Sequence, residues 1–447
     1  MQSVQPKYGY GMTLSACLWL GLFPLLHGGT YSRLTHDKWV IMLILCGVTL
    51  ACFLFDRVLH PLIRKARSEP AGADALPVPP RRTERTRMLP LLLAAALLLW
   101  TVLSCLFSRY GADTWWLGGS ARYEGLLTEL CYFALFFCFF FSRIRLKPVL
   151  FSAAAGVAVF FTVVMIQRSG GNPFGLYPEN TGFATHYEFQ GTIGNIDMGT
   201  GYLLLLGSLF LYGLISSGFK DRKGVAAVLL LSLLITLFLI VTMGVQFGLI
   251  SLGVLFLVTL LRFLPKKVRL PLLILILVLA LLVVWFWPGQ SGGLWELHEI
   301  LHGRTRLSFG SDRVAVWSYS LMLARENLLF GGGSGTFRDR FNQYLSDHQL
   351  TIPAEQDGVP LPNYFDNPHS VYIAWLTDHG LPAALLFLAL LFISVFRRQE
   401  GGLPLLSPCS AAVLCYAVQA FFSFSVCIVA PMFWVVLGLS FTESDSV

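Results

Sequence analysis

Long apolar segments separated by short polar ones run through most of the chain, a pattern typical of a bundle of membrane-spanning helices. A helix crosses a bilayer with about 20 predominantly apolar residues, and twelve segments approach that length. The predicted spans are 12–27, 38–55, 88–107, 125–142, 149–166, 198–217, 225–243, 245–261, 270–288, 371–396, 404–424 and 426–441. The pairs 225–261 and 404–441 could also be divided differently. The predicted fold class is an all-α polytopic membrane protein with about 12 transmembrane helices.

One polar segment, 289–368, is much longer than the others. It holds six arginines together with carboxylates and histidines, whereas the spans offer few polar residues for chemistry. We therefore interpret it as one large, partly helical catalytic loop. The chain then divides into 1–288 with nine spans, the loop 289–368, and 369–447 with three spans.

The distribution of basic residues predicts how the chain is oriented. With the N-terminus inside, Lys7 and five loops carry 21 of the 32 Lys and Arg residues; these loops are 57–87, 143–147, 218–224, 262–269 and 396–402. Short cytoplasmic loops are enriched in Lys and Arg. Both termini are therefore predicted to be cytoplasmic and the loop 289–368 extracytoplasmic.

The segment 57–87 is basic and rich in Pro and Ala. This composition favours a flexible cytoplasmic linker that lies against anionic lipid headgroups. A nucleic-acid partner is a much weaker interpretation, because the net charge of +7 comes mostly from the inner loops. Membrane lipids are thus an expected partner and nucleic acid is not.

Composition excludes an ordinary soluble domain and gives no sign of a cofactor. Hydrophobic residues make up 55% of the chain and charged residues 13%, against roughly 25% charged residues in soluble domains. All nine cysteines fall inside predicted spans, so we expect neither a disulfide framework nor a cysteine metal site in the outer loops. No metal and no cofactor are predicted.

Two outer segments near helix starts contain candidate anion-binding or supporting residues. Arg122 and Glu124 precede the fourth span, where the arginine could meet a lipid phosphate or simply pair with the glutamate. Asn195 lies in the turn that leads into the sixth span, and the free N–H groups of such a helix start attract anions. Glu129, one turn into the fourth span, is expected to have a structural partner.

The large loop contains a predicted surface helix with an arginine in its first turn. Ser311 could cap a helix that begins at Asp312, which places Arg313 against the helix dipole. The apolar face of this helix is expected to consist of Val314, Trp317, Leu321 and Ala324. An anionic ligand would remove the small cost of the arginine's position, so Arg313 is a candidate phosphate ligand.

A glycine run, GGGSGTF at 331–337, follows this helix. It lacks the Gly-Lys-Ser/Thr ending of a P-loop. Gly333 and Gly335 could form an anion-binding nest or a plain turn between helices. Arg338 follows directly and is a further candidate ligand of an anion.

The loop ends in Asp366-Asn367-Pro368-His369, where a coil gives way to the tenth span. Proline suits the first turn of a helix, so His369 is placed at the mouth of the membrane domain. Histidine is the side chain best able to accept a proton near neutral pH. We interpret His369 as a catalytic base or a phosphate ligand and Asp366 as a supporting carboxylate.

These segments together resemble the O-antigen ligase and polymerase superfamily of polytopic glycan-transfer enzymes. The resemblance covers about 105–395 and is carried by ARYEGLL, GTIGNIDMGTGYLL, SDRVAVW…ENLLFGGGSGTF and NPHSVYIAWLTDHGLPAALL. It implies an inverting, metal-independent glycosyltransferase that moves a glycan from an undecaprenyl-diphosphate carrier to a lipid or cell-surface acceptor. It further implies that Arg122 and Arg313 bind the diphosphate and that His369 is the loop histidine of the family. The chain departs from the family pattern at Asp197 and Ser370, where the family usually has Asn.

Three functions remain as hypotheses. A ligase would join a finished glycan to its acceptor at the outer face of the bacterial cytoplasmic membrane, and a polymerase would use a second carrier-linked glycan as acceptor. A 12-span transporter or flippase should instead show broken helices and polar residues near the midplane of its spans. Polarity here concentrates in one outer loop, which favours an enzyme.

The predicted topology can be tested by labelling intact cells. A cysteine at position 343, in place of Gln343, should react with a membrane-impermeant reagent, whereas one in place of Ala73 should react only after the cells are opened. The reverse pattern would place the loop 289–368 in the cytoplasm and contradict all three outer-face interpretations.

Overall fold

A computed structural model of the chain describes residues 9–59, 81–119, 121–178, 187–215, 222–352, 355–356, 359–360, 365–396 and 406–442. Most of the basic linker expected at 57–87 lies outside these residues. The described part is almost entirely helical, and its strands form two short antiparallel pairs, β1 (Phe189–Gln190) with β2 (Gly194–Asn195) and β3 (Glu355–Gln356) with β4 (Val359–Pro360).

Each of the twelve predicted spans contains an apolar helix. Eight stretches are long and apolar enough to cross a membrane. They comprise α2 (Leu34–Leu54) with its flanking turns, the apolar part of α4 (Arg81–Leu106), α7 (Leu146–Arg168), α9 (Ile196–Ile215), α10 (Lys223–Met243), α11 (Gln246–Phe263), α12 (Lys266–Trp285) and α16 (Val371–Phe396). Four are shorter, namely Tyr10–Leu25, which begins with α1 (Tyr10–Cys17), and α6 (Leu126–Phe140), α17 (Pro408–Gln419) and α18 (Ala430–Ser440). The polytopic all-helical class is thus supported, while the count of twelve crossings stays a prediction.

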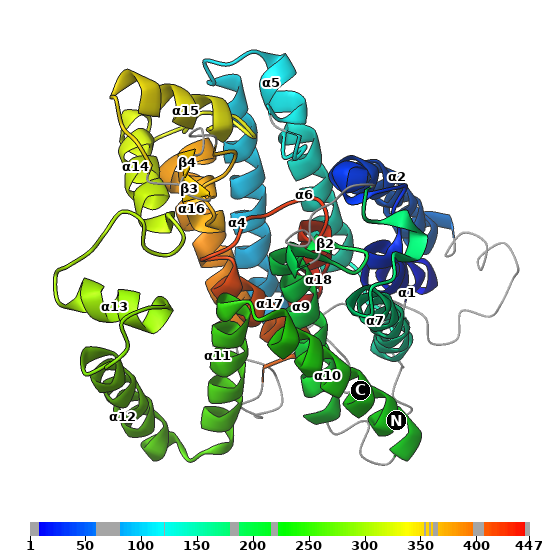
Figure 1. Cartoon of the computed structure of the whole chain (residues 1–447). Helices are drawn as coiled ribbons and strands as arrows, with labels where there is room; N and C mark the ends of the chain where they lie inside the picture. Colours follow the sequence, from blue (N-terminus) through cyan, green and yellow to red (C-terminus); the bar gives the residue numbers. More distant parts are fainter. Residues whose placement is uncertain are drawn as a thin grey trace, which may run out of the picture.

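Helix α9 lies at the centre of the bundle, between α10 and α17 (Figure 1). Of its most apolar window, 83% is buried, the highest share among the eight long helices. Small residues make this possible: a Cβ at Gly207 would press on Thr236 of α10, and one at Gly201 on Gln419 of α17. Such small residues let membrane helices approach closely. By contrast, α12 stands at the margin of the structure and buries no residue.

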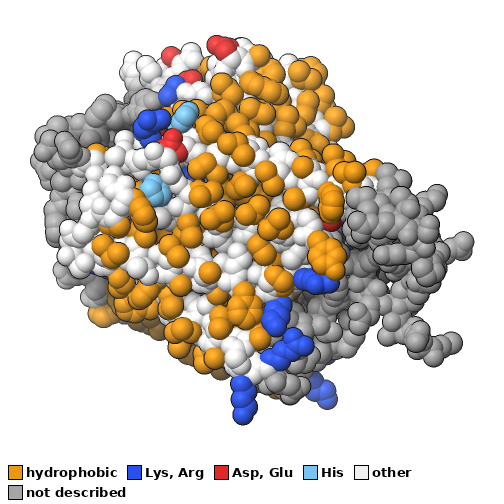
Figure 2. Space-filling view, turned by 90° about the vertical axis from the view of Figure 1, so that its right-hand side faces the viewer, with side chains coloured by type: hydrophobic (Ala, Val, Ile, Leu, Met, Phe, Trp, Pro, Cys, Tyr) orange, Lys and Arg blue, Asp and Glu red, His pale blue; other side chains and the backbone are white. Residues whose placement is uncertain are grey.

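The outer surface of the bundle matches a lipid environment. Figure 2 shows a broad band of hydrophobic side chains on one face, with Lys and Arg side chains gathered at its lower end. Many leucines, valines and isoleucines of α10, α11 and α12 are exposed, among them Leu231, Leu234, Leu260 and Leu277. Apolar side chains facing outward are stable when acyl chains surround them.

The segment between α12 and α16 folds into three helices and has a small core of its own. These are α13 (Gly293–Leu301), α14 (Arg313–Glu326) and α15 (Phe337–Asp347). The core between α14 and α15 consists of Ala315, Val316, Leu323, Phe337, Phe341, Leu345 and Ile352. In Figure 1, α14 and α15 lie together beside the upper end of α16.

Helix α14 differs from its prediction in two respects. It begins at Arg313, because Ser311 and Asp312 both have left-handed φ angles, 54° and 64°, and neither side chain caps the helix. Its buried face includes Val316, and Leu321, predicted to be buried, is exposed. The helix packs against α15 on one side and α16 on another, so its burial does not follow a single stripe.

Helix α16 is broken at Gly380, and the break fastens the outer segment to the bundle. Gly380 has φ 81° and ψ 176°, a conformation that is essentially restricted to glycine. Its successor Leu381 donates its N–H to the carbonyl of Leu328, two residues beyond the end of α14 (2.7 Å). The carbonyls before the break, at Thr377 and Asp378, accept the N–H groups of the glycine run, as detailed below.

We predict that Gly380→Ala destabilises the protein by about 1–3 kcal/mol or more, because the alanine would be strained in this conformation and its Cβ would overlap the Leu329 carbonyl oxygen. The measurement is the thermal unfolding midpoint of the detergent-solubilised protein. Gly253→Ala is the matched control, since a Cβ at Gly253 in α11 meets no atom within 4 Å. Equal unfolding midpoints for the two variants would show that position 380 does not require glycine.

Candidate functional site

His369 is held rigidly just before α16 begins. Its backbone has φ 50°, and its N–H donates to Oδ1 of Asn367 (2.9 Å) in a tight turn. The Pro368 carbonyl accepts the indole N–H of Trp317 from α14 (2.9 Å). The imidazole lies edge to face with Phe424, with the ring centroids 5.3 Å apart. Segments far apart in the sequence therefore fix one histidine ring.

Arg122 reaches this histidine from the turn before α6. Its Nε donates to a carboxylate oxygen of Asp366 (2.5 Å), and its guanidinium lies 4.2 Å above the Phe424 ring. The second oxygen of Asp366 accepts from the Asn367 amide. Although burial acts to raise the pKa of Asp366, the bond from Arg122 holds it below its usual value. Asp366 is therefore an ionised partner of Arg122.

Arg313 approaches His369 from the start of α14. Its Nη1 donates to the Gly310 carbonyl (2.9 Å), and its guanidinium lies 5.0 Å from the centre of the Phe247 ring. Its Nε is buried without a hydrogen-bond partner among the described residues. Burial lowers the pKa of Arg313, and the nearby Asp197 carboxylate opposes that shift. The arginine stays charged despite its lowered pKa. It therefore supplies a buried cationic hydrogen-bond donor near His369.

The imidazole of His369 is neutral at physiological pH. Burial lowers its pKa from 6.5 to about 4, and the positive charges of Arg313 and Arg122 act in the same direction. Asp366 raises it by a smaller amount. The ring Nδ1 is buried and has no partner in the described part of the chain. A neutral imidazole near two guanidinium groups can accept a proton or a hydrogen bond at a nitrogen atom.

A cavity opens beside Arg122 and Asp366 and extends between α6, α16 and α18. It holds about 870 Å³ of empty space, open solvent at its mouth included. Eight aromatic side chains line it, together with four carboxyl side chains at Glu124, Glu129, Asp366 and Asp378. Burial raises the pKa of Glu124 to about 8, although Tyr132 donates a hydrogen bond to it.

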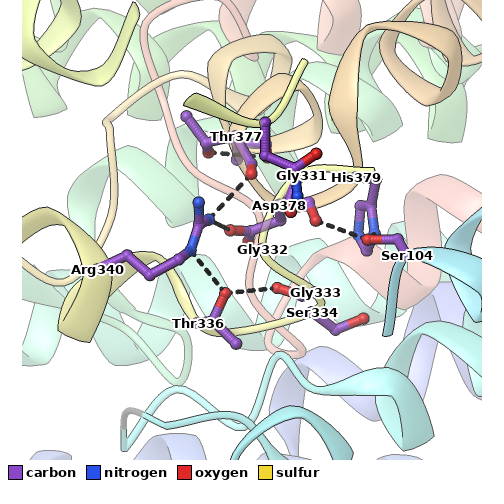
Figure 3. A network of polar contacts seen from close by, with 12 residues as sticks. Ser104, Gly331, Gly332, Gly333, Ser334, Thr336, Arg340, Thr377, Asp378 and His379 are labelled. Atoms are coloured by element: carbon purple, nitrogen blue, oxygen red, sulfur yellow. Dashed lines mark hydrogen bonds and ion pairs between the residues drawn. The ribbon is translucent and has the colours of Figure 1, made fainter. Parts of the chain in front are cut away.

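A second polar network (Figure 3) lies beside this cavity, and its Asp378 and His379 also line the cavity. Nε2 of His379 lies 2.9 Å from Oε1 of Glu129, and Ser334 of the glycine run donates to the other oxygen of Glu129. Arg340 of α15 donates to the Asp378 carboxylate (2.8 Å) and to the Thr377 carbonyl (2.9 Å). The structural partner expected for Glu129 is thus present, and it is a histidine of α16.

The glycine run forms a turn whose N–H groups are largely engaged within the protein. Gly332 donates to the Thr377 carbonyl (3.1 Å) and Gly333 to the Asp378 carbonyl (2.8 Å). The Gly335 carbonyl accepts the N–H of Gly119 (3.0 Å), and Gly335 also lines the cavity. This arrangement is that of a plain turn between helices, the second of the two possibilities that the sequence left open.

The predicted site residues fall into three places. Arg122, Arg313, Asp366 and His369 come together through the contacts and charge interactions described above, and Glu124 lies in the adjoining cavity. Asn195 caps α9, because its Oδ1 accepts the N–H of Asp197 (2.9 Å). Arg338 lies on α15 and pairs with Asp339 (2.7 Å), while the charges that act on His369 are those of Arg313, Arg122 and Asp366.

Sequence reasoning missed the roles of Arg340, Asp378 and His379. A signal was present: Asp378 and His379 are adjacent ionisable residues inside an otherwise apolar span, where such groups are costly and usually paired or functional. Their partners, Glu129 and Arg340, lie far away in the sequence. Among the described residues, no group of three His, Cys, Asp or Glu side chains has the arrangement of a metal site.

Comparison with known proteins gives one match. A family model described as O-antigen ligase matches residues 226–388, from α10 to α16. The matched region includes Arg313 and His369, whereas Arg122 lies outside it. The search of curated proteins found no match.

The neutral state of His369 predicts a specific loss of stability in acid. Above pH 6.5 the ring is neutral whether the chain is folded or unfolded. Between about pH 6.5 and 4 the unfolded chain binds a proton that the folded chain excludes, so stability falls by up to about 3 kcal/mol. His369→Asn, which tolerates the left-handed backbone, should remove this part of the loss. The measurement is the unfolding midpoint across that pH range, with the exposed His348→Asn as a control that behaves like the unmodified protein. Parallel curves for His369→Asn and the unmodified protein would contradict a buried neutral imidazole.

Proposed function

Starting from membership of the O-antigen ligase superfamily, which the match over 226–388 supports, we propose that this chain is a ligase-type glycosyltransferase. It moves a glycan from an undecaprenyl-diphosphate carrier to a lipid or cell-surface acceptor at the outer face of the cytoplasmic membrane. The observation that carries this proposal is the neutral His369 imidazole, held in a tight turn and packed against Phe424, close enough to Arg313 and Arg122 for both positive charges to lower its pKa. This arrangement unites a proton acceptor with cations for a phosphate leaving group.

The two arginines supply the electrostatic part of the reaction. As the bond between the sugar and the diphosphate breaks, negative charge develops on the leaving phosphate oxygen. Fixed cations in a partly dry site stabilise that charge strongly. Arg313 offers its buried, unpartnered Nε, and guanidinium groups match phosphate oxygens in bidentate fashion. We therefore assign the diphosphate to the space between Arg313 and Arg122 and route no step through a metal ion.

His369 supplies the acid–base part. An acceptor hydroxyl attacks the anomeric carbon from the face opposite the diphosphate and transfers its proton to a ring nitrogen of His369. One carbon–oxygen bond forms and one breaks, and because the attack comes from the opposite face the anomeric configuration inverts. The products are the glycosylated acceptor and undecaprenyl diphosphate. A ring with a pKa of about 4 is unprotonated at neutral pH but only weakly basic. The negative charge of a diphosphate bound by the two arginines would raise that pKa toward the working pH, and positioned bases whose pKa lies near the working pH contribute about 10²–10⁴-fold to the rate.

A polymerase of the same superfamily would use the same residues with a second carrier-linked glycan as acceptor. The two functions differ in the acceptor and share the donor chemistry. They are separated by supplying a carrier-linked glycan and an envelope glycolipid to the purified protein and identifying which of them becomes longer. If only the carrier-linked glycan becomes longer, the protein is a polymerase and the proposal of a ligase is wrong.

Variants of the two central residues should fail in different ways. We expect His369→Ala to bind undecaprenyl diphosphate normally while single-turnover transfer falls at least about a hundredfold. Arg313→Ala should weaken binding and transfer together, and Arg313→Lys should also be impaired because a point charge does not reproduce the planar fork. Binding and single-turnover transfer are measured on purified protein in lipid nanodiscs with EDTA present.

The controls are His348→Ala and Arg325→Ala, which change exposed residues of the same loop and should leave both quantities unchanged. Normal transfer by His369→Ala would remove this residue from the mechanism, and lost binding would make it a phosphate ligand. Transfer that requires added Mg²⁺ or Mn²⁺ would contradict the metal-free assignment.

A further inference from the structure

We propose that the aromatic cavity between α6, α16 and α18 binds the sugar ring of the acceptor. This inference rests on the proposed glycosyl transfer and assigns the second substrate to a defined place. Its lining includes Trp375, Phe387, Trp434 and Phe424, with Glu124 among its carboxyl groups.

The charge of the cavity disfavours the diphosphate of the donor. Four carboxyl side chains line it, at Glu124, Glu129, Asp366 and Asp378, against the cationic Arg122 and the histidine His379. Three of the carboxyl groups are paired with cationic side chains: Asp366 with Arg122, Glu129 with His379 and Asp378 with Arg340. These pairs leave no lining cation with uncompensated charge for a second anionic group, whereas neutral hydroxyl groups can donate to the carboxylates and accept from a protonated carboxyl such as Glu124.

The aromatic rings give the cavity flat apolar walls of the kind that cover the faces of a pyranose ring. Trp375 stacks on Phe387, with centroids 5.0 Å apart and the planes 20° from parallel. Trp434 lies nearly parallel to Tyr132 at 6.1 Å, on the α18 side. Ligand pockets combine such walls with a few fixed polar groups that set orientation. Here Glu124 is such a group, positioned by the hydroxyl of Tyr132 (2.8 Å).

The cavity also has the correct position relative to His369. Phe424 lines the cavity and contacts the imidazole edge to face at 5.3 Å. Pro368, the residue before the histidine, lines the cavity as well, whereas Arg313 is not among the lining residues. His369 itself is not a lining residue either, so the acceptor hydroxyl would reach its ring from the cavity past Phe424 and Pro368, while Arg313, the proposed diphosphate ligand, lies outside the cavity lining.

A prenyl chain is the competing occupant, since most of the lining is apolar. The carboxyl groups argue against it, because covering them with hydrocarbon removes their water without supplying hydrogen bonds and costs several kcal/mol. The exposed apolar faces of α10, α11 and α12 offer a hydrocarbon chain a surface without this penalty.

The test uses Trp375, which contacts neither Arg313 nor His369 in the interactions described. Full-length protein in nanodiscs receives the carrier-linked glycan and increasing amounts of glycolipid extracted from the envelope of cells that lack this chain. We expect Trp375→Leu to raise the glycolipid concentration for half-maximal transfer by about tenfold, while the affinity for undecaprenyl diphosphate stays unchanged. Trp375→Phe keeps a ring on Phe387 and should produce a smaller increase, which keeps the test valid if the leucine variant folds poorly. Trp116→Phe on the exposed helix α5 (Ala112–Leu117) is the matched control and should change neither quantity.

Three results would overturn the assignment. Weaker binding of undecaprenyl diphosphate by Trp375→Phe, with unchanged half-saturation by glycolipid, would give the cavity to the donor. If undecaprenol inhibits transfer by the unmodified protein but not by Trp375→Leu, the cavity binds a prenyl chain. If neither half-saturation by glycolipid nor affinity for undecaprenyl diphosphate changes, the acceptor binds outside this cavity. Failure of the proposed function itself is distinct, because then the unmodified protein would transfer no glycan to either acceptor.

Discussion

The arrangement depends on one constraint, which is that backbone groups at membrane depth must be hydrogen-bonded within the protein. The break at Gly380 frees carbonyls of α16, and the glycine run provides the N–H groups that satisfy two of them (Figure 3). Because the paired carbonyls lie within an apolar candidate span, this pairing is difficult to replace. It fixes the outer helices α14 and α15 against α16, and so determines where Arg313 lies relative to His369.

The docking of α14 and α15 also determines which charges surround His369. Two arginines held near each other repel, and the structure compensates with carboxylates on both sides, Asp366 for Arg122 and Asp197 for Arg313. The histidine between them stays neutral because a third positive charge in a half-buried position would be unfavourable. A diphosphate entering this space would relieve the repulsion between the arginines. Under the proposed function, the site would therefore favour an anion before any substrate binds.

The sequence predicted those features that depend on local pattern. Hydropathy located all twelve apolar helices, since a run of apolar residues is a one-dimensional signal. It also placed His369 at the start of α16 and grouped it with Arg313. The start and the buried face of α14 were wrong, because Ser311 and Asp312 adopt left-handed backbone angles and the helix packs against two neighbours. The pairing of His379 with Glu129 was not accessible, because it joins residues 250 positions apart.

The same distance in sequence explains why the glycine run was ambiguous. A run of glycines can expose N–H groups to an anion or bring them against another backbone, and only the tertiary partner decides which occurs. Here the partner is the broken segment of α16, and the turn supports the site without itself offering Gly332 and Gly333 to a phosphate. In the proposed reaction, positive charge for the leaving group would then come from side chains, namely Arg122 in the turn before α6 and Arg313 of α14. The docked glycine turn holds the outer helices against α16, so binding of the proposed diphosphate would depend on the turn even though the turn does not touch the substrate.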